Sequence, residues 1–485
     1  MPHKVIIIGA GLAGLSAGIR LQELGIESEI FELAPWAGGM CTAWERGGYR
    51  FDGCIHWMVG TRNTEPMYRD YEWCGALNPD VAIYHAPFID FELDGTMYRI
   101  PLDPKGFRAF LKDCSAEDAK EIDALCNHID RVSASEMPMG EPNGFGELMH
   151  MLIKSRKYLS VMPKYMNQTV GELCDKFKSE TVKAILCHLM PSDFAAVALI
   201  MMLGTRLGGN AGYPIGGAYE MTRRILDRYL SLGGTVHYSA RVNRILVEEG
   251  LATGVEADGL RYRADAIIAA CDAYDTIYRM LGGQYHHPQL EESLKTAPLF
   301  HPLVLVSFGL KRRFGIPYAV TFEVPQGISV SDTQKIHGFT LRSFEFDLTS
   351  APEGCSSVMV MAEAPIAYWL HLKNNDPVAY KLEKQHMANE FAQAINERYP
   401  GFINAIEVTD VSTPATYVRL TNVFKGSFEG FAPTKEALTK KIPMTFSDLG
   451  GLLICGQWTT AGGGICTAVT SGKRAAEMMK KALEP

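Results

Sequence analysis

The chain has 485 residues, of which 47% are hydrophobic and 21% are charged, and its formal net charge is −8 at pH 7. This composition is typical of a globular protein and excludes a disordered chain, a collagen-like repeat and a disulfide-rich scaffold. The mildly acidic balance argues against nucleic-acid binding, which needs a basic surface. Length alone suggests about three domains.

The start of the chain and the spacing of its cysteines predict a cytoplasmic protein. The first apolar run begins at Val5, which leaves no room for a secretory signal peptide. In the most apolar window, 184–204, only Phe194 to Leu203 is uninterrupted, so we expect one or two buried helices and no bilayer span. The eleven cysteines form no Cys-x-x-Cys pair, so neither a disulfide framework nor a metal site is expected.

The N-terminal residues predict a nucleotide-binding unit. A β-branched run from Lys4 to Ile8 indicates a buried strand, a G-x-G-x-x-G turn follows, and apolar residues then recur at helical spacing. The next strand ends at Glu32, whose carboxylate is placed to accept hydrogen bonds from a ribose. Glycines in such a turn let the backbone approach a pyrophosphate at the positive end of the helix dipole. The predicted binding residues are Gly9, Gly11, Leu12, Ala13, Gly14 and Glu32.

The acidic Glu32 disfavours NADP and leaves FAD or NAD as the nucleotide. A second glycine pair, Gly38-Gly39, followed by Met40, would bring backbone to the ribose and phosphates from the other side. With these motifs, and with the run from Gly48 to His56, the chain resembles the glutathione-reductase-type FAD flavoproteins. It is most similar to the phytoene desaturase, carotenoid isomerase and retinol saturase family.

The sequence departs from that family at two points. The family often has arginine where Met40 stands, and the glycine of its Phe-Asp-x-Gly motif falls one place early, at Gly53. Further motifs follow in the family's order, including Pro214-x-Gly-Gly and a second glycine turn near the C-terminus. The resemblance implies that Val242 lies near the adenine and Gly456 near the ribityl phosphate. It also implies that Gly464 and Ile465 lie near the flavin ring.

The resemblance implies an α/β protein in which a discontinuous Rossmann-like FAD-binding domain carries a mixed α+β substrate domain. The FAD-binding domain is expected from residues 1–72, 206–275 and 436–485. The substrate domain is expected from residues 73–205 and 276–435. Two domains therefore replace the three that length suggests.

Methionine is concentrated in the first substrate segment, where nine of the 22 methionines lie between Met137 and Met202. Methionine suits irregular apolar cavities, so this excess fits either a plain helical core or a channel for a long apolar substrate. Basic and aromatic side chains from Lys154 to Tyr165 border apolar ones there. They indicate either a solvated helix face or a peripheral membrane contact.

The function expected from these features is FAD-dependent oxidoreduction of carbon–carbon bonds, by hydride transfer at flavin N5, in an apolar polyene or isoprenoid lipid. Desaturation, saturation and isomerisation all remain open, as does the electron donor or acceptor. His56 is the candidate acid or base because its ordinary pKa suits proton transfer near neutrality, although it could also only hydrogen-bond its loop. The main alternative is an amine oxidase, with Trp57 and Trp458 as an aromatic pair at the flavin. A non-enzymatic prenyl-group carrier related to Rab GDP-dissociation inhibitors is a third.

Overall fold

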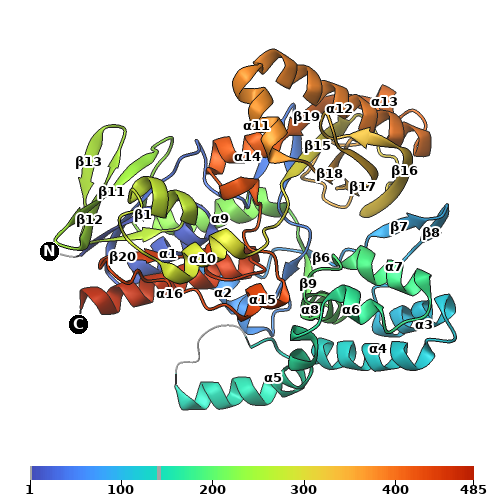
Figure 1. Cartoon of the computed structure of the whole chain (residues 1–485), viewed down its shortest axis with the longest axis horizontal. Helices are drawn as coiled ribbons and strands as arrows, with labels where there is room; N and C mark the ends of the chain where they lie inside the picture. The colour runs from blue at the N-terminus through green and yellow to red at the C-terminus, as the bar shows by residue number, and fades with distance from the viewer. Residues whose placement is uncertain (1–2, 139–143, 485) are drawn as a thin grey trace.

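The computed structural model describes residues 3–138 and 144–484, which form three lobes (Figure 1). The lobe that holds both chain ends contains a parallel sheet. A second lobe contains a larger, mostly antiparallel sheet covered by helices, and the third lobe is helical. The described residues include no helix long and apolar enough to cross a membrane.

The first sheet is five-stranded and parallel, with the order β10-β2-β1-β14-β20. Alternate residues of β1 face opposite cores: Val5 and Ile7 pack with helices α1, α9 and α16, whereas Ile6 and Ile8 pack with a β-meander on the other face. The near-continuous apolar run of β1 follows from this burial on both faces. These elements are β1 (Lys4–Ile8), α1 (Leu12–Glu23), β2 (Glu27–Phe31), α9 (Gly217–Ser231), β10 (Thr235–His237), the meander β11 (Val242–Glu248), β12 (Leu251–Ala257) and β13 (Leu260–Arg263), β14 (Ala266–Ala269), η1 (Asp275–Met280), α10 (Pro288–Thr296), β20 (Leu452–Ile454) and α16 (Gly464–Leu483).

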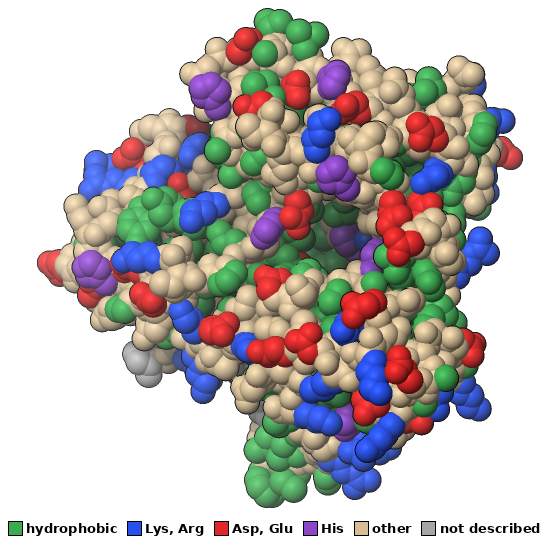
Figure 2. All heavy atoms as spheres, turned by 45° about the vertical axis from the view of Figure 1, so that its right-hand side comes forward, with side chains coloured by type: hydrophobic (Ala, Val, Ile, Leu, Met, Phe, Trp, Pro, Cys, Tyr) green, Lys and Arg blue, Asp and Glu red, His purple; other side chains and the backbone are tan. Residues whose placement is uncertain are grey.

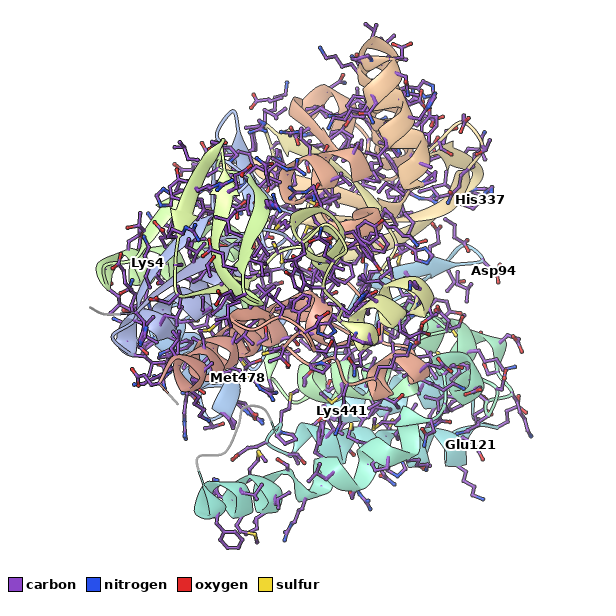
Figure 3. The ribbon with its side chains drawn as sticks, turned by 60° about the vertical axis from the view of Figure 1, so that its left-hand side comes forward. Lys4, Asp94, Glu121, His337, Lys441 and Met478 are labelled. Carbon is purple, nitrogen blue, oxygen red and sulfur yellow. The ribbon has the colours of Figure 1, made fainter. Side chains whose placement is uncertain are left out.

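The second sheet has seven strands in the order β19-β15-β18-β17-β16-β7-β8. Its last two strands come from a distant part of the chain, and β7 pairs in parallel with β16 through Val320 opposite Asp90. Figure 3 places Asp94, between β7 and β8, on the same side of the molecule as His337 on β17. The elements of this lobe are β7 (Asp90–Leu93), β8 (Thr96–Tyr98), β15 (Leu303–Leu310), β16 (Ala319–Ser329), β17 (Lys335–Ser343), β18 (Ser356–Glu363), α11 (Ile366–Asn375), α12 (Pro377–Arg398), α13 (Phe402–Ala405) and β19 (Ile406–Ser412).

The helical lobe has its own apolar core. The apolar window 184–204 is divided between two of its helices, α7 and α8, as predicted, because Pro191 interrupts the run between them. The lobe consists of α3 (Pro104–Cys114), α4 (Ala119–Ser133), α5 (Phe145–Met166), α6 (Val170–Cys174), α7 (Glu180–Leu189) and α8 (Ala196–Leu207).

Short elements join the three lobes, and two of the four predicted domain bounds fall among them. The predicted bounds near 72 and 435 lie within α2 and α15, and those near 205 and 275 lie at the end of α8 and the start of η1. The connecting elements are β3 (Ala43–Arg46), β4 (Tyr49–Asp52), β5 (Met58–Val59), α2 (Pro66–Cys74), β6 (Ile83–Tyr84), β9 (Ala211–Pro214), α14 (Pro414–Thr421), η2 (Phe424–Gly426), α15 (Lys435–Thr439) and η3 (Gln457–Thr459).

Candidate functional site

A cavity of about 1300 Å³ runs from the carboxyl ends of the parallel strands into the space between the other two lobes. Figure 2 shows it as a hollow with hydrophobic side chains inside. At its rim the exposed side chains of His301 and Glu363 are joined by a 2.9 Å contact between Nδ1 and Oε2. A crevice at the carboxyl ends of parallel strands is the usual ligand site of such sheets.

The first glycine turn forms one wall of the cavity, where Gly9, Gly11, Leu12 and Ala13 line it. Gly9 has a φ of +102°, and a Cβ there would lie 2.9 Å from the carbonyl oxygen of Ala270. Gly14 lies behind the turn, where a Cβ would collide with the Gly9 carbonyl oxygen. Because no side chain caps α1 at Gly11, the first amides of the helix are free to donate to a ligand in the cavity.

Glu32 lines the cavity at the end of β2 and organises the turn around it. Its two carboxylate oxygens accept hydrogen bonds from the backbone amides of Ala10, at 2.6 Å, and Ala34, at 2.7 Å. Burial raises the pKa of Glu32, and these amide donors oppose that rise. Each oxygen keeps a second lone pair, so the group can still accept hydrogen bonds from a diol.

The second glycine pair packs directly on the first turn. The amide of Gly38 donates to the Ala10 carbonyl at 2.9 Å, and a Cβ on Gly39 would lie 3.2 Å from the Gly11 Cα. Gly38, Gly39 and the adjoining Met40 all line the cavity. Backbone therefore borders the same space from two sides.

The C-terminal motif forms a third wall, where Gly456, Gly464 and Ile465 line the cavity. Helix α16 begins after Gly463 without a side-chain cap, so a second set of free helix amides is available at this wall. Val242, at the start of β11, lines the cavity as well. All of the predicted binding residues except Gly14 thus border one cavity, and Gly14 supports the turn from behind.

His56 and Trp57 lie on the loop between β4 and β5, and both line the cavity. Burial and the guanidinium groups of Arg342 and Arg206 hold the pKa of His56 well below its ordinary value of 6.5. The loop is anchored at this point because the hydroxyl of Tyr318 donates to the His56 carbonyl. The imidazole is therefore neutral at pH 7, so it is not available as an imidazolium acid, and its lowered pKa also makes it a weak base.

A family model described as flavin-containing amine oxidoreductase matches residues 12–479 of this chain. The chain belongs to the flavin-containing amine oxidoreductase family. Two uncapped helix N-termini, a Glu32 carboxylate and close-packed glycines are the donors and cradle that a dinucleotide needs, so the flavin of this family member is FAD. The protein is an FAD-dependent oxidoreductase.

Individual relatives of this family member are distant but match along its length. It is 24% identical to the lycopene-forming phytoene desaturase of Pseudescherichia vulneris, over 99% of this chain and 100% of that one. It is 22% identical to the all-trans-retinol 13,14-reductase of Danio rerio, over 85% of this chain and 74% of that one. The cyclohexylamine oxidase of Brevibacterium oxydans has the same fold, with a TM-score of 0.59, 16% identity and complete coverage of both chains. These similarities confirm the predicted α/β flavoprotein fold and the resemblance to the desaturase and saturase group.

The two tryptophans considered as an amine-oxidase pair both line the cavity, but each packs against a different part of its wall. Trp458 is buried against Phe431, with ring centroids 5.2 Å apart, whereas Trp57 lies beside the guanidinium of Arg206 in the core of the helical lobe. Among the described residues, no ring contact joins the two indoles. Trp57 forms part of the pocket wall, as predicted.

Methionines fill the channel side of the cavity. Of the nine methionines in the rich segment, Met139 lies outside the described residues, and six line the cavity: Met137, Met162, Met166, Met190, Met201 and Met202. The channel interpretation therefore accounts for most of the excess, although several of these side chains also pack in the helical core.

Glu429 is an acidic residue of the site that the sequence did not identify; Asp272 also lines the cavity, but its carboxylate accepts hydrogen bonds from the amides of Asp275 and Phe424. Glu429 lies within the Gly426–Gly430 motif, lines the cavity, and places Oε1 3.3 Å from where a Cβ of Gly464 would stand. Burial raises the pKa of Glu429 from 4.5 to about 7. The motif drew attention to its glycines, and a single acid between them forms no recognisable pattern. Glu429 becomes a candidate site residue because its carboxyl group lies beside the second glycine turn, at Gly464.

Proposed function

We propose that this enzyme moves hydride between FAD and a carbon–carbon bond of an apolar, polyene or isoprenoid substrate. The observation that carries the proposal is the continuity of the cavity from the nucleotide walls into a methionine-lined channel. Relatives named as a desaturase of phytoene and a reductase of all-trans-retinol support it, because they act on the same kind of bond in opposite directions. When bound, FAD supplies a ring that accepts or donates hydride at N5.

The protein's own residues would position the cofactor and move the proton that accompanies the hydride. We assign the cradle to the residues predicted from the sequence: Gly9, Gly11, Leu12, Ala13, Gly14, Glu32, Gly38, Gly39, Met40, Val242, Gly456, Gly464 and Ile465. For the proton, Glu429 is better suited than His56, because a carboxyl group with a pKa of about 7 is present in both protonation states near neutrality. His56 would then act as a neutral wall residue or a weak base.

The direction of the reaction should be visible in its pH dependence. If Glu429 donates a proton while a double bond is saturated, the rate falls as the pH rises above about 7. If it removes a proton during desaturation, the rate rises over the same range. Glu429→Gln should flatten either profile, and the exposed Glu353→Gln should leave it unchanged.

The test of the function is anaerobic spectroscopy of the holoenzyme. Oxidised enzyme is mixed with phytoene, retinol or a primary amine, and dithionite-reduced enzyme with retinol. Bleaching or reoxidation of the flavin band by a polyene, or polyene isomerisation without net bleaching, supports the proposal. Response to the amine alone would favour the amine-oxidase alternative.

We also propose that helix α5 rests on a membrane surface from which the substrate enters. Phe145, Ile153 and Leu159 are exposed on this helix, and Lys154 and Lys157 lie between them. Tyr158 and Leu159 line the cavity, so the same helix borders the channel. An amphipathic helix with basic residues beside exposed apolar ones suits an anionic bilayer interface.

Ile153→Glu should reduce sedimentation of the enzyme with anionic lipid vesicles, and Leu348→Glu, at another exposed apolar residue, should not. Equal sedimentation of both variants and the wild type would contradict the α5 assignment.

The eleven thiols are all free, including Cys174 and Cys187, whose sulfur atoms are 3.4 Å apart, and this supports a reducing, cytoplasmic location. The two-domain division predicted from the sequence, with bounds adjusted to the ends of the helices, remains part of the proposal.

A further inference from the structure

Two arginines lie buried beside the cavity, close to His56. Arg206, at the end of α8, and Arg342, on β17, are each only 5% exposed. The guanidinium carbon of Arg206 is 4.3 Å from the ring centre of Phe88, and that of Arg342 is 5.8 Å from the ring centre of Tyr318. The two cations repel each other, and burial together with this repulsion lowers the pKa of Arg206 to about 10. Arginine stays protonated in proteins at neutral pH, so both groups are cations at pH 7.

Neither guanidinium has an acidic partner. Among the described residues, no carboxylate oxygen lies within 4.0 Å of Arg206 or Arg342. Arg206 donates to the carbonyl oxygens of Ala86, at 3.0 Å, and Pro87, at 2.7 Å, which satisfy part of its hydrogen bonding but none of its charge. The Nε of Arg342 is buried without any hydrogen-bond partner.

Asp52 is the acid whose charge is felt at Arg342, but it is fully engaged elsewhere. Its carboxylate accepts hydrogen bonds from the amides of Cys54, Ile55 and Ala218 and from the hydroxyl of Tyr213. Burial raises the pKa of Asp52, and no ion pair joins its carboxyl group to either arginine, so both guanidinium charges lack a paired counter-charge in an apolar environment. A buried charge without a partner is costly, so its persistence indicates that a partner arrives from outside the chain.

Arg342 is the arginine that faces the channel. It lines the cavity together with Thr340 on its own strand and Met361, which pairs with Thr340 on β18, whereas Arg206 does not line the cavity and lies against Trp57. A ligand group in the channel can therefore reach the Arg342 guanidinium while its apolar part lies along the methionines. A planar guanidinium fork matches a carboxylate in geometry, and a carboxylate brings the one negative charge that the single cavity-lining guanidinium can pair, whereas a phosphate monoester brings nearly two.

We propose that the channel binds substrates that carry a carboxylate at one end of an apolar chain, and that Arg342 receives this carboxylate. The inference rests on the proposed function and narrows it from hydrocarbon polyenes to polyene or isoprenoid acids. Arg206 supports the site as a second buried positive charge, behind Trp57. His56 also lines the cavity, but its imidazole is neutral. It therefore offers no second positive charge that would attract the carboxylate away from Arg342.

The test compares a conjugated polyene acid with its methyl ester on the holoenzyme. cis-Parinaric acid and methyl cis-parinarate are titrated while the polyene fluorescence is followed. Loss of one charged hydrogen-bonded contact corresponds to about ten- to a hundredfold in affinity, so the acid should bind the wild type more tightly by that factor. In Arg342→Met the acid should fall to the affinity of the ester, and ester binding should be unchanged. Arg342→Lys keeps the charge without the fork and should retain part of the preference.

Arg99→Met is the matched control, because it removes the same side chain at a position that is 80% exposed and does not line the cavity. Equal affinity of the wild type for acid and ester overturns the inference, as does an unchanged preference in Arg342→Met with full flavin content. If Arg342→Met fails to retain flavin, Arg342→Lys and the wild-type comparison still decide the matter. If the flavin exchanges electrons with retinol but the enzyme binds acid and ester equally, only the carboxylate-site proposal is refuted. If the enzyme prefers the acid but its flavin responds to no polyene, the carboxylate site is supported and the proposed function is refuted.

Discussion

Glu429→Gln is expected to stabilise the protein at alkaline pH and to change its stability little in acid. Burial raises the pKa of Glu429 from 4.5 in the unfolded chain to about 7 in the folded protein. Stability from this group is therefore fully present below pH 4.5 and is lost as the pH rises toward 7, because only the unfolded chain solvates the ionised carboxylate well. At about 1.4 kcal/mol per pH unit, the wild type should be less stable than the variant by about 3 kcal/mol above pH 8 and about 1 kcal/mol at pH 5.

Urea unfolding at several pH values, with FAD in fixed excess and tryptophan fluorescence as the signal, measures this difference. Glu353→Gln, at an exposed loop position, corrects for general effects of removing a charge. If Glu429→Gln and the wild type lose stability in parallel between pH 5 and pH 8, the carboxyl group ionises without cost in the folded protein. The reasoning that makes Glu429 the proton carrier would then be refuted.

Three further substitutions test the cavity walls. Gly11→Ala should fold normally, since the new Cβ meets no protein atom closer than 3.9 Å, but should lose flavin at least about tenfold, and full flavin content would contradict the cradle. Glu32→Ala strips two backbone amides, including that of Ala10, of their acceptor, so chemical unfolding should show a loss of about 2 kcal/mol or more. Met361→Trp should obstruct the channel and slow flavin reduction by polyenes while leaving the flavin spectrum unchanged, and an unaltered rate would place the substrate elsewhere.

The nucleotide end of the site could be predicted from the sequence because its signals are local. Gly9, Gly14 and Glu32 lie within one strand–turn–helix–strand unit, and each has a steric or hydrogen-bonding reason that the neighbouring residues reveal. The channel was predicted only as one of two interpretations, because a methionine-rich composition does not show which side chains face a cavity.

The polar groups of the substrate end could not be predicted, because no short pattern connects them. Arg206 lies near the end of α8 and Arg342 near the end of β17, and they become neighbours only after these distant parts of the chain fold together. In the sequence, neither arginine belongs to a motif that distinguishes it from an ordinary surface or structural arginine. Glu429 was overlooked for the same reason, since its raised pKa arises from burial and from the glycine turn that approaches it.

The parallel pairing of β7 with β16 has a consequence for how the chain folds. Asp90 pairs with Val320, which is synthesised about 230 residues later. The ladder between the two strands therefore forms late, and closing so long a loop costs conformational entropy. Until then the part of β16 that pairs with β7, at Val320 and Thr321, would present an unprotected strand edge, the kind of surface on which chains aggregate. Truncated chains that lack residues 73–205 would keep that edge unpaired permanently. Residues 73–205 and 276–435 should therefore be expressed together, as one cooperative unit.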